Sequence, residues 1–562
     1  MPFLKFNIIL MKHTKRNIFT GIVIGILTVV CAGFVHNDFE LAKNLDIYSS
    51  LLRQLDENYV DEINVNDLVT ASINAMLEKL DPYTVFYPES ELEEFKLMTT
   101  GQYGGIGATI QQDSDYVLIS EPYEGFPAYN AGLQPGDKIL EIEHKSVKGK
   151  TVSDVSNLLK GQPGTTIHLS IMPYGSSKAV RKEITRQEIK FPNVSYSGML
   201  NDTVGYIRLD QFTENAANDV KNAFIRLKNQ GMNHLVFDLR GNGGGLLNEA
   251  VDIVNLFVNP DNVVVSTKGK SSDKTQVFAT HNAPLDTKIP IIVLVDGASA
   301  SASEIVSGAL QDFDRAVIIG QRTFGKGLVQ NIMPLSYNTR VKITVSKYYI
   351  PSGRCIQGID YGDKDEKGLS KRKADSSATA FKTKNGRVVY DYGGIEPDIK
   401  VDIPPYSTVL LAMFEKKLIF NYANEYKLKH KHMVPAKEFT ISDDVYRDFT
   451  NYVKAKNLSY ETYTEKQIKV LKNSCKDDKF SVAIENQIQQ LEMAVQKEKE
   501  ADMDKYKKEI SQLLQMEIVS RYYAQKGRIE SSLSIDPDIA KSIEIFADNK
   551  QYYNILKPGG KK

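Results

Sequence analysis

Two glycine- and alanine-rich stretches of the chain carry residues suited to acyl transfer. The first, Asp296 to Glu304, follows an apolar strand and opens a helix, and it places Ser301 at the turn between them. A serine there lies at the carboxyl end of the strand, where the first helical N–H groups can stabilise developing negative charge. Ser301 or Ser303 would also suit a plain helix N-cap, and the stretch taken alone favours this structural role.

A nucleophilic serine needs a base, and the second stretch supplies a lysine. None of the eight histidines lies in a glycine-rich or strand-end setting, and a Gly-x-Ser-x-Gly motif is absent. Lys326 stands between Gly325 and Gly327, after an apolar strand. The reference pKa of lysine is about 10.4, so burial must lower it by several units before the amine can accept a proton. Gln330, four residues on, could orient that amine in a Ser–Lys dyad.

The lysine stretch also invites a competing hypothesis, a phosphate-binding loop. Gly320 to Lys326 matches the first seven positions of that motif, but the eighth, which should be Ser or Thr to hold magnesium, is Gly327. The residues that follow, Leu328 to Leu335, have the pattern of a strand and not of the required helix. Both departures remove the mechanism of nucleotide binding.

The candidate residues fall in a region of alternating strands and helices, which predicts an α/β core over residues 196–404. Continuous apolar strands followed by helices are typical of parallel pairing with both sheet faces covered. The polar, charged residues 359–390 interrupt this core and are interpreted as a surface insertion or mobile loop. The expected strands are Val204–Leu209, Leu235–Leu239, Ile291–Val295 and Ala316–Ile319, and the expected helices are Asn215–Asn229, Asn248–Phe257 and Ala302–Leu310.

With these motifs the chain resembles the C-terminal processing peptidases, also called tail-specific proteases. The resemblance extends over roughly Gly101 to Ile403, more than half of the chain. It rests on ordered motifs, namely Asp238 to Leu246, Ser299 to Glu304, Thr323 to Gly327, Tyr349 to Arg354 and Gly394 to Asp398. It implies that Ser301 is the nucleophile, Lys326 the base and Gln330 the support of the lysine. It also implies a core like the crotonase α/β spiral.

The same resemblance implies an oxyanion hole made of backbone N–H groups. One would come from Ala302 and the other from a glycine of the 243–245 loop, with Gly244 and Gly245 as candidates. The chemistry requires no metal ion or nucleotide, so no cofactor is expected.

Residues 101–188 form a separate β-rich module. Ala128 to Leu140 resembles the Ala-Gly-Leu-x-x-Gly-Asp-x-Ile signature of PDZ domains, although Gly132 and Gly136 would also suit a purely structural β-module. Peptide binding is assigned to the loop before it, where backbone N–H groups can form a nest for a substrate carboxylate. That loop consists of Gly104, Gly105, Ile106 and Gly107.

Both ends of the chain are predicted to be helical, over residues 41–100 and 405–562. Basic residues precede an apolar run at 18–35, so residues 1–36 have the pattern of a signal anchor or signal peptide. This pattern predicts export to the periplasmic side of the inner membrane, with the protein anchored or released. The helical ends also leave room for a homo-oligomer.

The composition limits the classes of partner. The 70 basic and 70 acidic side chains balance, so no strong field favours nucleic acid. The three cysteines are too few and too scattered for a disulfide framework or a zinc site. The leading hypothesis is an α/β multidomain serine endopeptidase that acts on proteins or peptides with exposed C-termini. The alternative is a catalytically inactive PDZ scaffold that only binds peptides.

Overall fold

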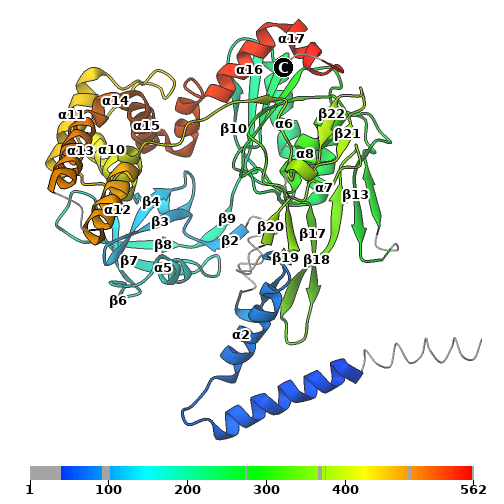
Figure 1. Cartoon of the computed structure of the whole chain (residues 1–562), viewed down its shortest axis with the longest axis horizontal. Coiled ribbons are helices and arrows are strands. Elements are labelled where there is room, and N and C mark those ends of the chain that lie inside the picture. Colours follow the sequence, from blue (N-terminus) through cyan, green and yellow to red (C-terminus); the bar gives the residue numbers. More distant parts are fainter. Residues whose placement is uncertain are drawn as a thin grey trace, which may run out of the picture. The chain divides into compact units, whose positions relative to one another are not determined.

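The computed structural model describes residues 39–91, 102–271, 275–364, 370–373, 375–478 and 482–559 (Figure 1). It divides into two units, Met1–Phe86 and Tyr87–Lys562. The predicted signal or anchor segment, residues 1–36, lies outside the described residues. Among the residues that are described, no helix has the length and apolar character needed to cross a membrane.

The first unit contains two helices, residues 39–58 and α2 Val65–Glu78. Asn64 caps α2, because its side-chain oxygen accepts the N–H of Asn66 at 3.0 Å. The helical prediction for these residues is confirmed. Of the remaining residues predicted to be helical, 92–100 lie outside the described residues, and Glu89–Glu91 form a single 3₁₀ turn at the start of the second unit.

A six-stranded sheet forms the centre of the second unit, in the order β10-β11-β12-β15-β16-β23. All neighbours from β11 onward pair in parallel, and β10 pairs antiparallel with β11. The predicted parallel α/β core is thereby confirmed. The strands are β10 Val194–Met199, β11 Val204–Leu209, β12 His234–Asp238, β15 Ile291–Val295, β16 Val317–Gly320 and β23 Ile399–Lys400.

Helices cover both faces of this sheet, which explains why its strands are apolar throughout. One face packs against α6 Ala216–Asn229, α7 Leu247–Asn255 and α8 Ala302–Asp312. The other face packs against α16 Pro537–Ala547 and α17 Asn549–Ile555 at the far end of the chain. The last helices of the chain therefore belong to the core that holds the candidate site.

A second, antiparallel sheet carries the residues that follow the lysine loop. It contains β13 Val263–Gly269, β14 Gln276–Ala279, β17 Leu328–Pro334 and β18 Arg340–Tyr349. Strands β17 and β18 form a hairpin in which Gln330 lies opposite Thr344 and Ile332 opposite Lys342. The prediction of a strand after Gly327 is confirmed, and a phosphate-binding loop, which needs a helix there, is excluded.

The β-rich module is built around its own core, which includes Ile119, Leu133, Val155 and Ile167. Its main sheet has the order β3-β4-β5-β7-β8, so that β3 Ala108–Asp113 is an edge strand. The other strands are β4 Tyr116–Pro122, β5 Lys138–Ile142, β6 Lys145–Ser146, β7 Thr166–Met172 and β8 Val180–Thr185. Two short helices, α4 Pro127–Asn130 and α5 Val152–Leu159, and the strand pair β2 Gln102–Gly105 and β9 Gln187–Lys190 complete it.

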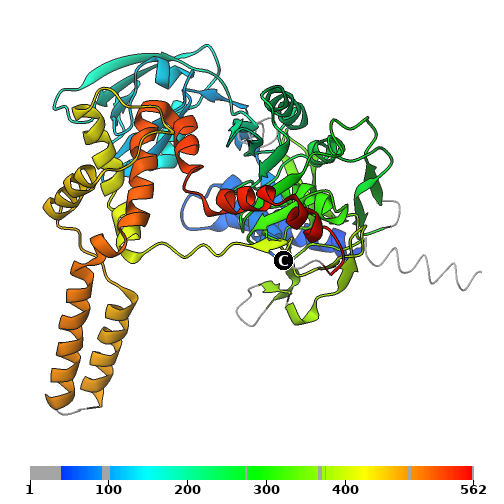
Figure 2. The same cartoon turned by 90° about the horizontal axis from the view of Figure 1, so that it is seen from above.

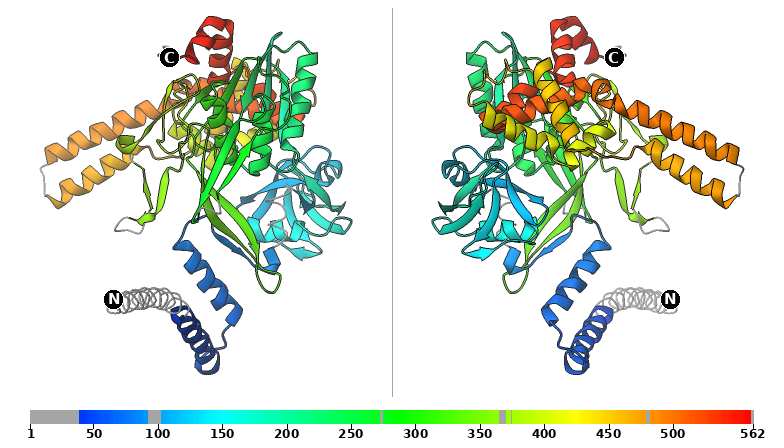
Figure 3. Two further views of the ribbon diagram at one scale, coloured as in Figure 1. Left: turned by 90° about the vertical axis from the view of Figure 1, so that its right-hand side faces the viewer. Right: turned by 90° about the vertical axis from the view of Figure 1, so that its left-hand side faces the viewer.

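Helices follow residue 405, as predicted. They are α9 Thr408–Glu415, α10 Leu418–Lys429, α11 Asp443–Ala455, α12 Tyr463–Asp477, α13 Val482–Glu500, α14 Asp502–Lys505 and α15 Lys507–Ser532. Helices α12 and α13 run side by side as a long hairpin (Figures 2 and 3). Helices α9, α10, α11 and α15 share a separate apolar core.

The charged insertion is more structured than its composition predicts. Its described residues form the strand pairs β19 Ile359–Lys364 with β20 Ser370–Arg372, and β21 Ala380–Lys382 with β22 Val388–Tyr390. A 3₁₀ turn, Asp375–Ser377, lies between the two pairs. Ion pairs attach this segment to the core, Asp375 with Arg322, and Arg387 with Asp314 and Asp398. Composition alone does not reveal such pairs.

Candidate active site

Ser301 lies directly before α8 in a conformation that serine rarely adopts, with φ 55° and ψ −112°. A non-glycine residue in such a region costs about 1–3 kcal/mol, and it persists only where the surroundings enforce it. Asp296 folds the preceding turn, because its carboxylate accepts the N–H groups of Ala298 and Ser299, each at 3.0 Å. The strand-to-helix turn predicted for the nucleophile is therefore present and strained.

The glycine loop 241–245 passes next to this serine. The N–H of Ala300 donates to the carbonyl of Asn242 at 3.0 Å. A Cβ on Gly244 would lie 2.8 Å from the Cβ of Ser301 and 2.9 Å from the amide nitrogen of Ala302. Only glycine fits at position 244, and the close approach gathers backbone N–H groups around Ser301.

These backbone N–H groups differ in whether they are free to bind a ligand. The N–H of Gly244 is not free, because it donates to Asn242 Oδ1 at 2.9 Å. For Gly245 and Ala302, no acceptor of the backbone N–H is found among the described residues. Donors of this kind, fixed beside a serine, are the material of an oxyanion hole.

The lysine loop is held from two sides. The N–H of Gly327 donates to Gln357 Oε1 at 2.7 Å, and the carbonyl of Gly325 accepts the N–H of Gly358 at 2.9 Å. A Cβ on Gly325 would lie 2.8 Å from the backbone carbon of Gly393. The glycine beside Lys326 thus permits tight packing of the loop against residues that follow β18.

Glu304, which the sequence analysis did not select, connects the serine turn to the lysine loop. Its carboxylate accepts the N–H of Ser301 at 2.9 Å and the N–H groups of Gly325 and Lys326 at 2.8 and 2.9 Å. It also accepts the hydroxyl of Thr323 at 2.5 Å. One buried carboxylate therefore fixes the backbones of both proposed catalytic residues.

The environment of Glu304 shifts its acidity. The side chain is fully buried, and this burial raises its pKa to about 7, while the four hydrogen bonds favour the ionised form and oppose the rise. Its position three residues after Ser301 is the Ser-x-x-Glu pattern of a helix N-terminus, and this pattern could have identified it in the sequence.

Tyr348 is a second residue that the sequence analysis missed. Its hydroxyl lies 3.1 Å from the carbonyl oxygen of Ser301 and 2.5 Å from that of Lys326, to which it donates. The ring is 1% exposed. No local pattern on β18 distinguishes this tyrosine from Tyr349 beside it.

Replacing Tyr348 by phenylalanine is expected to lower kcat/KM about tenfold, since two buried carbonyl groups lose their shared donor and both loops relax. Steady-state cleavage of a peptide substrate measures the loss. Tyr349→Phe is the matched control on the same strand, because no hydrogen bond of its hydroxyl is found among the described residues. Equal kcat/KM values for the two variants would contradict a role of the Tyr348 hydroxyl in holding the two loops.

A cavity of about 390 Å³ brings the predicted catalytic residues together. Ser301, Lys326 and Gln330 all line it, as do the oxyanion candidates Ala302, Gly244 and Gly245. Gln330 Nε2 donates to Thr344 Oγ1 at 3.2 Å, which orients its amide. The hydrogen bond from Gln330 to the lysine amine stays a prediction.

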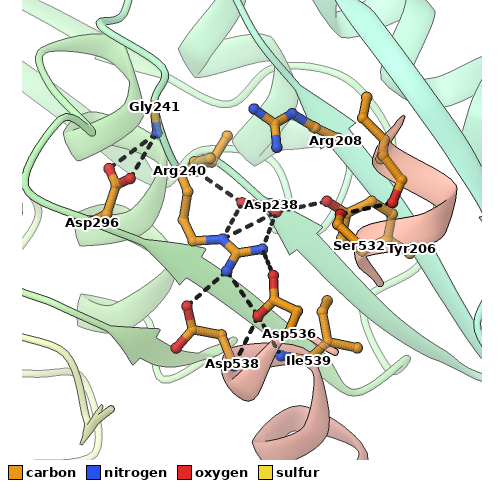
Figure 4. A network of polar contacts seen from close by, with 12 residues as sticks. Tyr206, Arg208, Asp238, Arg240, Gly241, Asp296, Ser532, Asp536, Asp538 and Ile539 are labelled. Atoms are coloured by element: carbon orange, nitrogen blue, oxygen red, sulfur yellow. Dashed lines mark hydrogen bonds and ion pairs between the residues drawn. The ribbon is translucent and has the colours of Figure 1, made fainter. Parts of the chain in front are cut away.

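An ion-pair network behind the glycine loop ties it to the end of the chain (Figure 4). Arg240 contacts Asp238 at 2.6 Å, Asp536 at 2.8 Å and Asp538 at 2.7 Å. Burial opposes ionisation of Asp238, but the ion pair with Arg240 holds its pKa below the ordinary value. Helix α16 thus supplies counter-charges to the loop that faces Ser301.

The charged insertion contacts the lysine loop through Arg322. Its two terminal nitrogens donate to the two carboxylate oxygens of Asp375 at 2.8 and 3.0 Å, and Nε donates to Glu396 at 2.5 Å. Asp375 belongs to the insertion, and Arg322 lies four residues before Lys326. Asp375, within the predicted surface insertion, is thus bound bidentately by a residue of the core.

The predicted peptide-binding loop lies away from this cavity. Gly104 and Gly105 belong to β2, and the carbonyls of Ile106 and Gly107 accept the N–H groups of Ala128 and Tyr123 at 2.7 and 2.9 Å. No acceptor of the N–H groups of Ile106 and Gly107 is found among the described residues. These two donors next to the edge strand β3 suit a carboxylate and an extended peptide.

Comparisons with known proteins find related families and sequences. Residues 203–362 match the model of peptidase family S41, residues 118–171 match a PDZ domain, and residues 409–546 match the C-terminal helical domain of probable PDZ-proteases. The carboxy-terminal-processing protease of Bartonella bacilliformis is 35% identical over 328 residues, which cover 58% of this chain and 75% of the relative. A probable CtpA-like serine protease of Staphylococcus epidermidis is 33% identical over 362 residues, covering 62% and 73%.

The solved structures that are similar to this chain include the photosystem II D1 C-terminal processing protease, which is 27% identical in sequence. The match covers 63% of this chain and 92% of that protein, with a TM-score of 0.35.

Proposed function

Because the chain belongs to the carboxy-terminal-processing proteases of peptidase family S41, serine-type peptidases with a PDZ domain, we propose that it cleaves proteins near their C-termini through Ser301 and Lys326. The neutral amine of Lys326 takes the proton of the Ser301 hydroxyl as its oxygen attacks the peptide carbonyl carbon. The peptide C–N bond then breaks, and the leaving amine receives that proton. Water, activated by the same lysine, hydrolyses the resulting ester and restores the serine.

The observation that carries this proposal is the pair of loops joined at Glu304. A single carboxylate accepts the N–H groups of Ser301 and Lys326, and both residues line one cavity. A nucleophile and its base must be held in fixed relative positions, and a shared buried acceptor achieves this.

The oxyanion of the tetrahedral intermediate is assigned to the N–H groups of Ala302 and Gly245. The amide of Gly244 is already engaged by Asn242, so Gly244 contributes close approach and not a donor. The removal of one such donor typically costs about 10²–10³-fold in kcat.

We assign recognition of the substrate C-terminus to the PDZ domain, at the N–H groups of Ile106 and Gly107 and the edge strand β3. The N-terminal export signal or anchor, the periplasmic location, the homo-oligomer and the crotonase-like spiral remain predictions from the sequence.

A serine-directed fluorophosphonate probe tests the function. Stoichiometric labelling is expected at Ser301, located by mass spectrometry, together with cleavage of unstructured peptides that have a free C-terminus. C-terminal amidation should raise KM, because the PDZ domain loses the carboxylate. No labelling and no cleavage by the folded protein would instead support the inactive scaffold.

A further inference from the structure

The charge of the catalytic cavity is one-sided. Its lining contains two lysines, Lys326 and Lys342, and no aspartate or glutamate among the residues that the structure describes. Lys326 is the proposed base and acts as a neutral amine. Lys342 has no role in the proposed mechanism. Its ammonium group is therefore the positive charge that the described cavity lining presents when Lys326 is neutral.

The register of the second sheet fixes where Lys342 stands. It lies on β18 directly opposite Ile332 of β17, and Gln330 lies opposite Thr344 (strands in Figure 1). Directly opposed residues share a face, and alternate residues of a strand are about 7 Å apart. Lys342 therefore lies about two extended residues beyond Gln330, on the same wall of the cavity.

No carboxylate among the described residues pairs with Lys342. Its ammonium group lies over the ring of Tyr87, whose centre is 5.9 Å from Nζ. Tyr87 also lines the cavity. A ring face attracts the ammonium and orients it, but the positive charge is left for a ligand.

Most of the other cavity side chains are apolar. Close to the nucleophile and along β17 they are Leu246, Leu247, Ile305, Leu328 and Ile332. A peptide lying along this wall would place apolar side chains against them and one position against the ammonium group. A carboxylate is the group of a peptide that pairs best with an ammonium.

We propose that Lys342 is a specificity residue that selects substrates carrying a carboxylate about two extended residues beyond the position beside Gln330. This inference rests on the proposed function and names part of its substrate class. The carboxylate is either an acidic side chain or the α-carboxylate of the substrate's end, and the two sources share the same chemistry.

A positional scan tests the proposal. Peptides with one common free C-terminus carry a single Glu or Gln at each position around the cleavage site. At one position, Glu is expected to raise kcat/KM by about three- to tenfold over Gln, and the gain should fall as salt rises. In Lys342→Met the Glu/Gln ratio at that position should drop to about one. A second set, shortened so that the chain ends there, identifies the α-carboxylate as the source.

Lys347→Met is the matched control, because Lys347 lies on the same strand, is exposed and does not line the cavity. It should keep the wild-type ratio. The same ratio is measured as peptide affinity by fluorescence anisotropy with Ser301→Ala, which does not depend on turnover. Cleavage or binding without any Glu/Gln preference, or a preference that survives Lys342→Met, overturns the proposal and leaves the peptidase function standing. Failure of the peptidase function shows separately as absent probe labelling of Ser301.

Discussion

Replacing Ser301 by alanine is expected to lower kcat/KM by at least about 10⁴-fold, and Lys326→Ala should be equally severe. Each variant removes one half of a unit that works only as a pair, so the double variant should be no less active than either single one. Progress curves on an unstructured peptide measure the loss, and fluorophosphonate labelling shows whether the nucleophile still reacts. Substantial cleavage by either single variant would contradict the dyad.

The strain at Ser301 gives this prediction an independent control in stability. Alanine at position 301 keeps the unfavourable φ of 55°, whereas glycine adopts it freely. Ser301→Gly should therefore unfold at higher denaturant concentration than Ser301→Ala, while both are inactive. This result would show that the loss of activity does not come from loss of fold.

Glu304→Gln is expected to lower kcat/KM by about 10²-fold or more. In either orientation of the glutamine amide its N–H₂ faces at least one backbone N–H donor, that of Gly325 or those of Ser301 and Lys326. Buried donors then lose their acceptor, and the contact between the two loops weakens. Slower probe labelling at Ser301 measures the lost alignment directly. Ser307→Ala on the same buried helix removes a 2.8 Å hydrogen bond to the carbonyl of Ser303 and should reduce stability with little effect on rate. Similar activity losses in both variants would indicate a general weakening of α8.

Glu304 also predicts how stability depends on pH. Its folded pKa of about 7 lies above the unfolded value of 4.5, so the folded state binds more protons between these pH values. The free energy of unfolding should then fall as pH rises from 4.5 to 7, by about 3 kcal/mol from this group. Urea unfolding at pH 5 and pH 8 should show this decline in the wild type and a smaller one in Glu304→Gln. Equal declines would mean that Glu304 stays ionised throughout.

Much of the site was predictable, because its key residues carry local signals. Glycines flank Lys326, and small residues surround Ser301 at the end of an apolar strand. The reactive side chains therefore stand next to the residues that a tight turn requires, and both signals fall within a few positions. Glu304 carries a local signal, the Ser-x-x-Glu spacing of a helix start, but its hydrogen bonds to Gly325 and Lys326 come from another segment and leave no mark in the sequence. Tyr348 carries no signal at all, because a tyrosine on β18 has the same pattern whether or not its hydroxyl contacts two carbonyl groups.

The fold shows the same division. Four parallel strands of the central sheet, β11, β12, β15 and β16, were predicted within one residue at each end, since burial on both faces leaves a continuous apolar run. The edge strands β10 and β23 were not predicted. Helical periodicity after residue 405 did not reveal that α16 and α17 pack on the central six-stranded sheet. An amphipathic pattern shows that one face of a helix is buried, but not which element covers it. The charges of Arg322 and Asp375 suggested solvated surface, whereas they meet each other.

The return of the last helices to the central sheet also sets the order in which a working enzyme can be made. Tyr552 bonds through its hydroxyl to both the N–H and the carbonyl of Ile291, and Asp538 pairs with Arg240 beside the glycine loop. These groups follow Ser301 by more than 230 residues, so they are synthesised well after it, and one face of the sheet stays uncovered until they have emerged. We expect a nascent chain to have its serine turn before it has the counter-charges behind it, so that proteolytic competence awaits the emergence of α16 and α17.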